Sequence, residues 1–204
     1  MNSLDAIYPL IVPQDYYCKG TWELPHRSFP ISDYILTWVF FKGSSAMSYI
    51  KEEEAEQLDV AHPGWQQRAF ENLKILEKDP GHFFTYFKLS KDGTIIFLSF
   101  LNEDGIGSSR ILLSNELRIA FPQGYHIAFP DRSCGMVIPK GIPENDLAEI
   151  RKMVKKMHRG ATIPMSNKLF DPDEFELPGE WLIPVNPFTS SALVASIQDI
   201  TPGQ

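Results

Sequence analysis

Cysteine is scarce in this sequence. The chain of 204 residues has two cysteines, Cys18 and Cys134, which lie far apart and outside any CxxC pair. This count excludes a disulfide framework and a zinc knuckle, and it favours a reducing cytoplasm as the location. The sequence also lacks HExxH or an equivalent histidine pair, so its spacing assembles no metal site. We therefore expect neither a metal nor a cofactor.

Long apolar runs and basic residues are also in short supply. The longest apolar segments, such as residues 35–41, are too short to cross a bilayer, and the first thirty residues do not have the pattern of a signal peptide. There are 19 lysine and arginine residues against 26 aspartate and glutamate residues, and the formal charge of −7 opposes nucleic acid over most of the surface. We expect no membrane span and no nucleic-acid partner.

The composition that is present is that of an ordinary globular domain. Hydrophobic residues make up 43% and charged residues 22%, and the chain is long enough to bury a core without disulfides. Residues 1–34, with prolines at positions 9, 13, 25 and 30, predict an irregular arm packed on the domain. Residues 35–186 predict a single domain, and residues 187–204 predict a loosely attached tail.

Local patterns predict several strands. The continuous run of β-branched and aromatic residues at 35–41 predicts a strand that is buried on both faces. Residues 83–89 and 94–101 flank an Asp-Gly pair and predict a hairpin. Residues 125–129 and 134–138 predict a second hairpin.

Helices are predicted at 46–58, at 64–78, at about 108–121 and from Pro143 to about residue 159, and a last strand is predicted at 175–185. Hairpins lie next to these helices, and strands and helices do not alternate strictly. The sequence therefore predicts an α+β fold, with an antiparallel or mixed sheet built largely from hairpins and about four helices packed against it.

Three short motifs indicate a family. They are Ala69-x-x-Asn72-Leu73, Asp104-Gly105 leading into Ser109-Arg110-Ile111-Leu112, and Ala128-x-Pro130. In these motifs the chain resembles the YtpQ-like family of uncharacterised bacterial proteins, grouped as a domain of unknown function. The resemblance extends from about Ile35 to Leu177, although the family has a longer region before the first strand. It implies domain boundaries but no activity, substrate or catalytic residue.

A glycine-containing loop is the first candidate ligand site. Residues 101–109 join a strand to a helix, and free amides at a helix N-terminus can hold phosphate. The loop has neither a GxxxxGK[ST] nor a full GxGxxG pattern, and Asp104 would repel an anion. Arg110 gains nothing from the helix dipole, so either a carboxylate such as Asp104 holds it or it faces a ligand. The candidate ligand or partner contacts are Asp104, Ser108, Ser109 and Arg110.

The strongest suggestion of catalysis is the cluster of His126, Asp131 and Cys134. A cysteine nucleophile needs an imidazole and a carboxylate nearby. A hairpin that pairs Phe129 with Cys134 would place Cys134 on the same face as Phe129 and His126 on the opposite face. We therefore expect no catalytic residue here, although a register shift of one residue would reverse the faces.

Three classes of function remain, in the following order. The first is a non-catalytic cytoplasmic interaction domain that binds a protein partner, and it predicts an exposed apolar patch. The second is a small-molecule or anion binder that uses the loop from Gly105 to Arg110, and it predicts a concave site with an unpaired guanidinium. The third is a Cys134-dependent enzyme, which needs an accessible thiolate close to a histidine.

Overall fold

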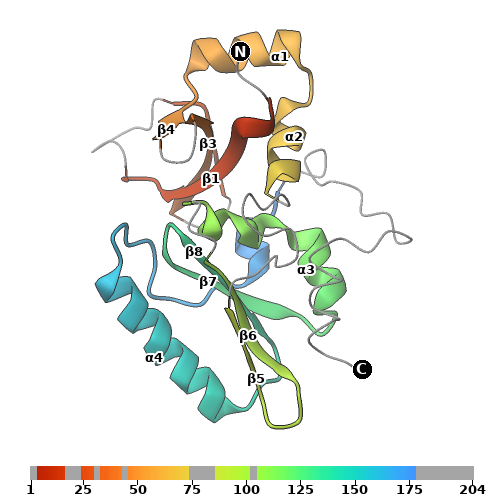
Figure 1. Cartoon of the computed structure of the whole chain (residues 1–204), viewed down its shortest axis with the longest axis vertical. Helices are drawn as coiled ribbons and strands as arrows, with labels where there is room; N and C mark the ends of the chain where they lie inside the picture. Colours follow the sequence, from red (N-terminus) through yellow and green to blue (C-terminus); the bar gives the residue numbers. More distant parts are fainter. Residues whose placement is uncertain are drawn as a thin grey trace.

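The computed structural model of the chain describes residues 4–16, 24–29, 33–42, 46–73, 86–101 and 105–177. Within these residues, eight strands form two antiparallel four-stranded sheets, accompanied by helices α1–α4. One sheet lies above the other along the long axis of the molecule (Figure 1). We call the described residues up to 73 the upper lobe and those from 86 the lower lobe. The predicted α+β class with antiparallel strands and about four helices is confirmed.

Strand β3 (Tyr34–Lys42) is the centre of the upper sheet. It contains the strand predicted at 35–41. Its successive side chains point to opposite faces, so it contributes apolar groups to both faces of the sheet. Its neighbours are β1 (Ile7–Pro13) along one edge and β2 (His26–Ser28) and β4 (Ala46–Tyr49) along the other.

Part of the predicted irregular arm is a regular strand, because Ile7–Pro13 pairs with β3 as β1. Its prolines do not interrupt the sheet, since β1 is an edge strand and proline is tolerated where the amide would face outward. The amide of Ile11 points away from β3 and donates to the Ser109 hydroxyl at 3.2 Å. Pro9 and Pro13 are two residues to either side of Ile11, so the amides that they lack would also have pointed away from β3.

Helices α1 (Glu52–Ala61) and α2 (Trp65–Asn72) follow β4. The start of the helix predicted at 46–58 is wrong, because residues 46–49 form β4 and pair with β3. The helix begins six residues later, where the Glu54 carboxylate accepts a hydrogen bond of 2.9 Å from the amide of the residue before α1. The helix predicted at 64–78 is confirmed over α2, and its last five residues lie outside the described part of the chain.

The lower sheet consists of the two predicted hairpins. Its order is β5–β6–β8–β7, so β6 of the first hairpin pairs with β8 of the second. The described parts of both hairpins confirm the predictions. The strands are β5 (Tyr86–Leu89), β6 (Ile95–Phe100), β7 (Tyr125–Asp131) and β8 (Cys134–Pro139).

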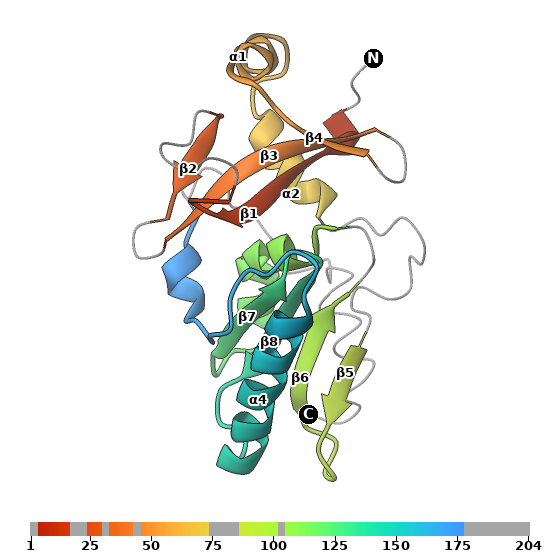
Figure 2. The same ribbon diagram turned by 90° about the vertical axis from the view of Figure 1, so that its left-hand side faces the viewer.

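Helices cover both faces of the lower sheet (Figure 2). The helix predicted from Pro143 is α4 (Glu144–Gly160), and its buried Ile150 and Val154 pack on one face. The helix predicted at about 108–121 consists of two pieces, the 3-10 helix η2 (Gly107–Leu112) and α3 (Ser114–Ala120). Both pieces pack on the other face and contribute to the core between the lobes.

The chain after α4 runs along the outer edge of β7. Phe170 and Ile127 exchange two backbone hydrogen bonds of 2.9 and 3.0 Å, and further backbone bonds follow at Met165 and Ser166. The strand predicted at 175–185 is wrong over its described residues, because residue 175 ends the 3-10 helix η3 (Pro172–Phe175) and residues 176–177 form no strand. The rest of that strand from residue 178, and the predicted tail at 187–204, lie outside the described residues.

A cluster of aromatic rings joins the lobes. The Tyr34 ring of the upper lobe meets the Phe129 ring of the lower lobe edge to face, with centroids 5.1 Å apart. Phe170 stacks on Phe129 at 5.0 Å, and Phe175 packs against the upper-lobe ring of Phe29 at 5.0 Å. One continuous hydrophobic core therefore extends through both lobes and holds them in a fixed relation.

Candidate functional site

The predicted loop site is buried at the junction of the lobes. The side chains of Ser108, Ser109 and Arg110 have exposed fractions of 0%, 0% and 1%. The Ser109 hydroxyl accepts the Ile11 amide, and the Arg110 guanidinium donates from Nε to the Leu73 carbonyl at 3.3 Å. Asp104, the fourth predicted contact, lies outside the described residues. The Ser109 and Arg110 side chains therefore bond to the protein itself, and all three described residues are closed to solvent.

The glycine of this loop serves close packing. A Cβ atom on Gly107 would come within 3.0 Å of the backbone oxygens of Ser133 and Phe100, a separation that real Cβ atoms do not show. A Cβ atom on Gly135 would likewise come within 3.0 Å of the Gly107 carbonyl oxygen. The backbones of η2 and β8 are therefore in direct contact. The amide of Ser108 donates to the Arg132 carbonyl at 3.1 Å. These contacts use the loop for packing and leave it a poor cradle for phosphate.

The hairpin of β7 and β8 corrects the predicted register by one residue. Asp131 pairs with Cys134 across a two-residue turn, and a bulge on β7 then brings Ala128 opposite Met136. His126 consequently pairs with Ile138 and shares a face with Cys134, contrary to the prediction. The two side chains are nevertheless four strand positions apart, about 13 Å at the usual rise per residue.

Cys134 lies in an apolar environment. It is 1% exposed and packs in the core beneath α4. Burial raises the pKa of the Cys134 thiol to about 12, and the nearby Asp131 carboxylate adds to the increase. Burial and the Lys140 ammonium lower the pKa of His126, which favours its neutral form. A protonated thiol this deeply buried is not a nucleophile at neutral pH.

Asp131 fixes the turn that follows β7. Its carboxylate accepts hydrogen bonds from the Ser133 amide at 2.8 Å, the Ser133 hydroxyl at 2.6 Å and the Ile163 amide at 3.0 Å. Burial raises the pKa of Asp131, but these hydrogen bonds outweigh burial and hold the pKa below its usual value. The carboxylate thus ties the hairpin to the segment along β7 and does not orient a catalytic histidine.

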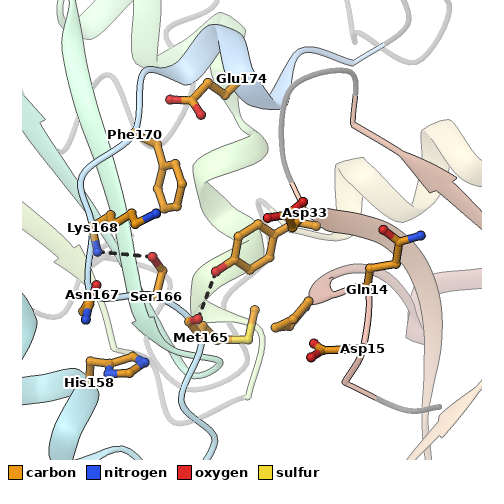
Figure 3. A pocket seen from close by; sticks show the side chains of 12 residues that line it. Gln14, Asp15, Asp33, His158, Met165, Ser166, Asn167, Lys168, Phe170 and Glu174 are labelled. Carbon is orange, nitrogen blue, oxygen red and sulfur yellow. Dashed lines mark hydrogen bonds between the residues drawn. The ribbon is translucent and has the colours of Figure 1, made fainter. Parts of the chain in front are cut away.

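A cleft between the lobes is a different candidate site (Figure 3). Its volume is about 720 Å³, within the range of ligand and peptide sites. The upper wall consists of Pro13, Gln14, Asp15, Asp33 and Tyr34. The lower wall consists of residues 165–168 with His158, Phe170 and Glu174.

Backbone pairing places both walls. Pro13 pairs with Tyr34 at the end of β1 and β3, and the Gln14 amide donates to the Asp33 carbonyl at 3.0 Å. Asp15 and Asp33 therefore leave the upper sheet at the same end. The lower wall is held by β7, because the Ser166 amide donates to the Phe129 carbonyl at 3.2 Å. The cleft thus forms where two distant segments meet, at the ends of regular pairing.

Tyr34 bridges the two walls. Its hydroxyl donates to the Met165 carbonyl at 2.9 Å. Burial raises the pKa of the Tyr34 hydroxyl, the hydrogen bond with Ser166 opposes this, and the carboxylates of Asp33 and Asp15 raise the pKa further. The hydroxyl therefore stays protonated at neutral pH and acts as a hydrogen-bond donor.

Three charged side chains of the cleft have no ion partner within the described part of the chain. Among the described residues, neither the carboxylates of Asp15 and Asp33 nor the ammonium of Lys168 forms an ion pair. All three residues are exposed. The carboxylate of Glu174 accepts the Asp171 amide at 2.9 Å and caps η3. Groups at the mouth of the cleft are thus open to a partner.

Sequence reasoning missed this cleft. Asp15 and Asp33 lie in the segment predicted as an irregular arm, and residues 165–168 of the lower wall lie in a stretch without regular structure. The apolar run at residues 7–12 was the available signal for β1, although Pro9 interrupts it and Pro13 follows it. Within the described ranges, no group of three or more histidine, cysteine, aspartate or glutamate side chains could hold a metal ion.

Comparison with protein-family models, curated proteins and solved structures finds no match in any of the three. The resemblance to the YtpQ-like family therefore stays a prediction. No helix in the described part of the chain is long and apolar enough to span a membrane. The fold and the cleft define a two-lobed α+β domain with a recessed polar surface between its lobes.

Proposed function

We propose that this protein is a non-catalytic interaction domain that binds a segment of a protein partner in the cleft between its lobes. The observation that carries the proposal is the cleft itself, about 720 Å³ in volume, with charged side chains that have no ion partner among the described residues. Recognition sites combine such a recess with a few placed polar groups.

The groups in the cleft favour binding over catalysis. The Tyr34 hydroxyl is bonded to Met165, and its raised pKa makes it a poor base. The thiol of Cys134 is buried away from the cleft, beneath α4. The polar groups that line the cleft, among them Ser166, Lys168 and His158, can donate, accept or carry charge, and this supports recognition.

The rim favours a protein partner. Gln14, Asp15, Asn167 and Lys168 are all exposed at the mouth, so a bound segment could continue beyond it. Tyr16, next to the upper wall, is 37% exposed, and aromatic residues are enriched at protein interfaces. We also propose a cytoplasmic location, which the unpaired and buried Cys134 supports.

Site-specific photo-crosslinking in cells tests the proposal. We would place p-benzoylphenylalanine at Gln14 or at Asn167, which face each other across the mouth, and at Gln123 as an exposed control in the turn before β7. The expected result is one discrete adduct shared by the two cleft positions and missing from the control. The same adducts at all three positions, or none at the cleft positions across growth conditions, would overturn the proposal.

A further inference from the structure

We infer that the cleft receives a cationic side chain, lysine or arginine, of the bound segment. This inference rests on the proposed function, because it names the chemistry of the segment that enters the same cleft. It follows from three features of the cleft: an acidic upper wall, aromatic rings at its base, and a lining that carries more negative than positive charge.

The acidic wall is made by Asp15 and Asp33. The pairing of β1 with β3 sets both residues at one end of the upper sheet, where the Gln14 amide bonds to the Asp33 carbonyl. Both carboxylates act electrostatically on the Tyr34 hydroxyl, so a cation bound near that hydroxyl would be attracted by both. Neither has an ion pair with a described residue to displace first.

The aromatic base is preformed. Tyr34 and Phe170 line the cleft with ring centroids 5.9 Å apart, and Phe170 is stacked on Phe129 with an interplanar angle of 3°. Figure 3 shows the Phe170 ring beside Lys168. An ammonium or guanidinium group binds well over such rings, and fixed rings lose little entropy on binding.

The charge balance of the lining also favours a cation. Among the described residues that line the cleft, Asp15, Asp33 and Glu174 contribute carboxylates and Lys168 contributes an ammonium, and His158 lies near the end of α4. Lys168 is on the wall that faces Asp15 and Asp33. A cation would therefore bind at the acidic wall, and Lys168 should weaken its binding from the opposite side.

NMR titration of the full chain with a capped tri-arginine peptide tests the inference. The helix α1 serves as an internal reference, because Glu52, Glu53 and Glu56 give it an exposed acidic surface and the helix itself has no aromatic residue. We expect the largest amide shifts at residues 14–15, 33–34 and 166–168, and none from capped tri-glutamate. Shifts that are equal or larger on α1, or a flat titration, would overturn the inference.

Charge variants test whether each charged side chain strengthens or weakens tri-arginine binding. Asp15→Asn with Asp33→Asn should weaken tri-arginine binding by roughly tenfold or more, and Lys168→Gln should strengthen it by roughly threefold, because like charge is removed. Glu52→Gln with Glu53→Gln removes the same number of charges from α1 and should change the affinity by less than about twofold. Weaker binding in Lys168→Gln would contradict the inference.

The two proposals can fail separately. If the crosslinked adduct from Gln14 persists in Asp15→Asn/Asp33→Asn and tri-arginine does not bind, the interaction domain stands and the cationic ligand is wrong. If tri-arginine binds in the cleft but no protein adduct forms there, the cation site stands and the protein partner is wrong.

Discussion

Residues 107–110 and the cleft between the lobes both place hydroxyl and charged side chains where the two halves of the molecule meet. In the buried loop, Ser109 and Arg110 bond to backbone groups of the upper lobe. In the cleft, Asp15, Asp33 and Lys168 are exposed and have no ion pair among the described residues. A polar residue next to a glycine loop therefore does not by itself indicate a ligand site, because the same chemistry can serve to dock two lobes.

The largest expected effect concerns Cys134, which is buried as the loop is, but beneath α4 on the other face of the lower sheet. In a Cys18→Ser background, the folded protein should react with iodoacetamide at pH 8 at least roughly a thousandfold more slowly than the protein unfolded in urea. The reason is that burial raises the pKa of Cys134 from 9.0 to about 12. A folded-state rate within tenfold of the unfolded rate would show that the thiol is accessible.

The same pKa predicts a pH dependence of stability. Because the folded pKa is above the unfolded value, the protonated thiol stabilises the fold fully below about pH 9, and this contribution is lost as pH rises toward about 12. The free energy of unfolding should therefore fall more steeply over this range in wild type than in Cys134→Ala. If chemical denaturation gave the same pH dependence of the free energy of unfolding for both proteins, Cys134 would not be its source.

Gly107→Ala should disrupt the close packing of η2 against β8. Its Cβ would meet the backbone of Ser133 and Phe100, which has no room to move, so the free energy of unfolding should fall by about 3 kcal/mol or more. The matched control is Gly160→Ala at the end of α4, where a Cβ meets nothing within 4 Å. Urea denaturation measures both variants, and similar losses would contradict the role of Gly107 in close packing.

Ser109→Ala should give a smaller loss. It removes the acceptor of the Ile11 amide and leaves that buried amide without its hydroxyl partner, at a cost of about 1–2 kcal/mol. Ser28→Ala, at an exposed position of β2, should change the free energy of unfolding by less than about 0.5 kcal/mol. If the two variants were equally stable, Ser109 would not join β1 to η2.

Much of the fold could be predicted because its signals are local. The Asp-Gly turn predicted the β5–β6 hairpin, and Pro143 with the acidic first turn predicted the start of α4. The register of β7 and β8 could not be predicted, because the bulge between Ala128 and Asp131 depends on tertiary packing. The missed bulge reversed the predicted face of His126.

The cleft could not be predicted for a related reason. Its walls come from residues about 130 positions apart in the sequence, and only the β1–β3 pairing and the aromatic cluster bring Tyr34 to Met165. The prolines of β1 concealed that pairing, since proline usually indicates irregular structure. Local patterns identify strands and turns, whereas a site between lobes depends on contacts that no local pattern contains.

Filling the cleft is the most direct test of whether a segment of a protein partner binds there. Asn167 is exposed at its mouth, so Asn167→Trp should change the free energy of unfolding by less than about 0.5 kcal/mol. We predict that this variant reduces the yield of the protein adduct from p-benzoylphenylalanine at Gln14 by roughly tenfold or more. An unchanged adduct yield with the cleft filled and the fold intact would contradict the account.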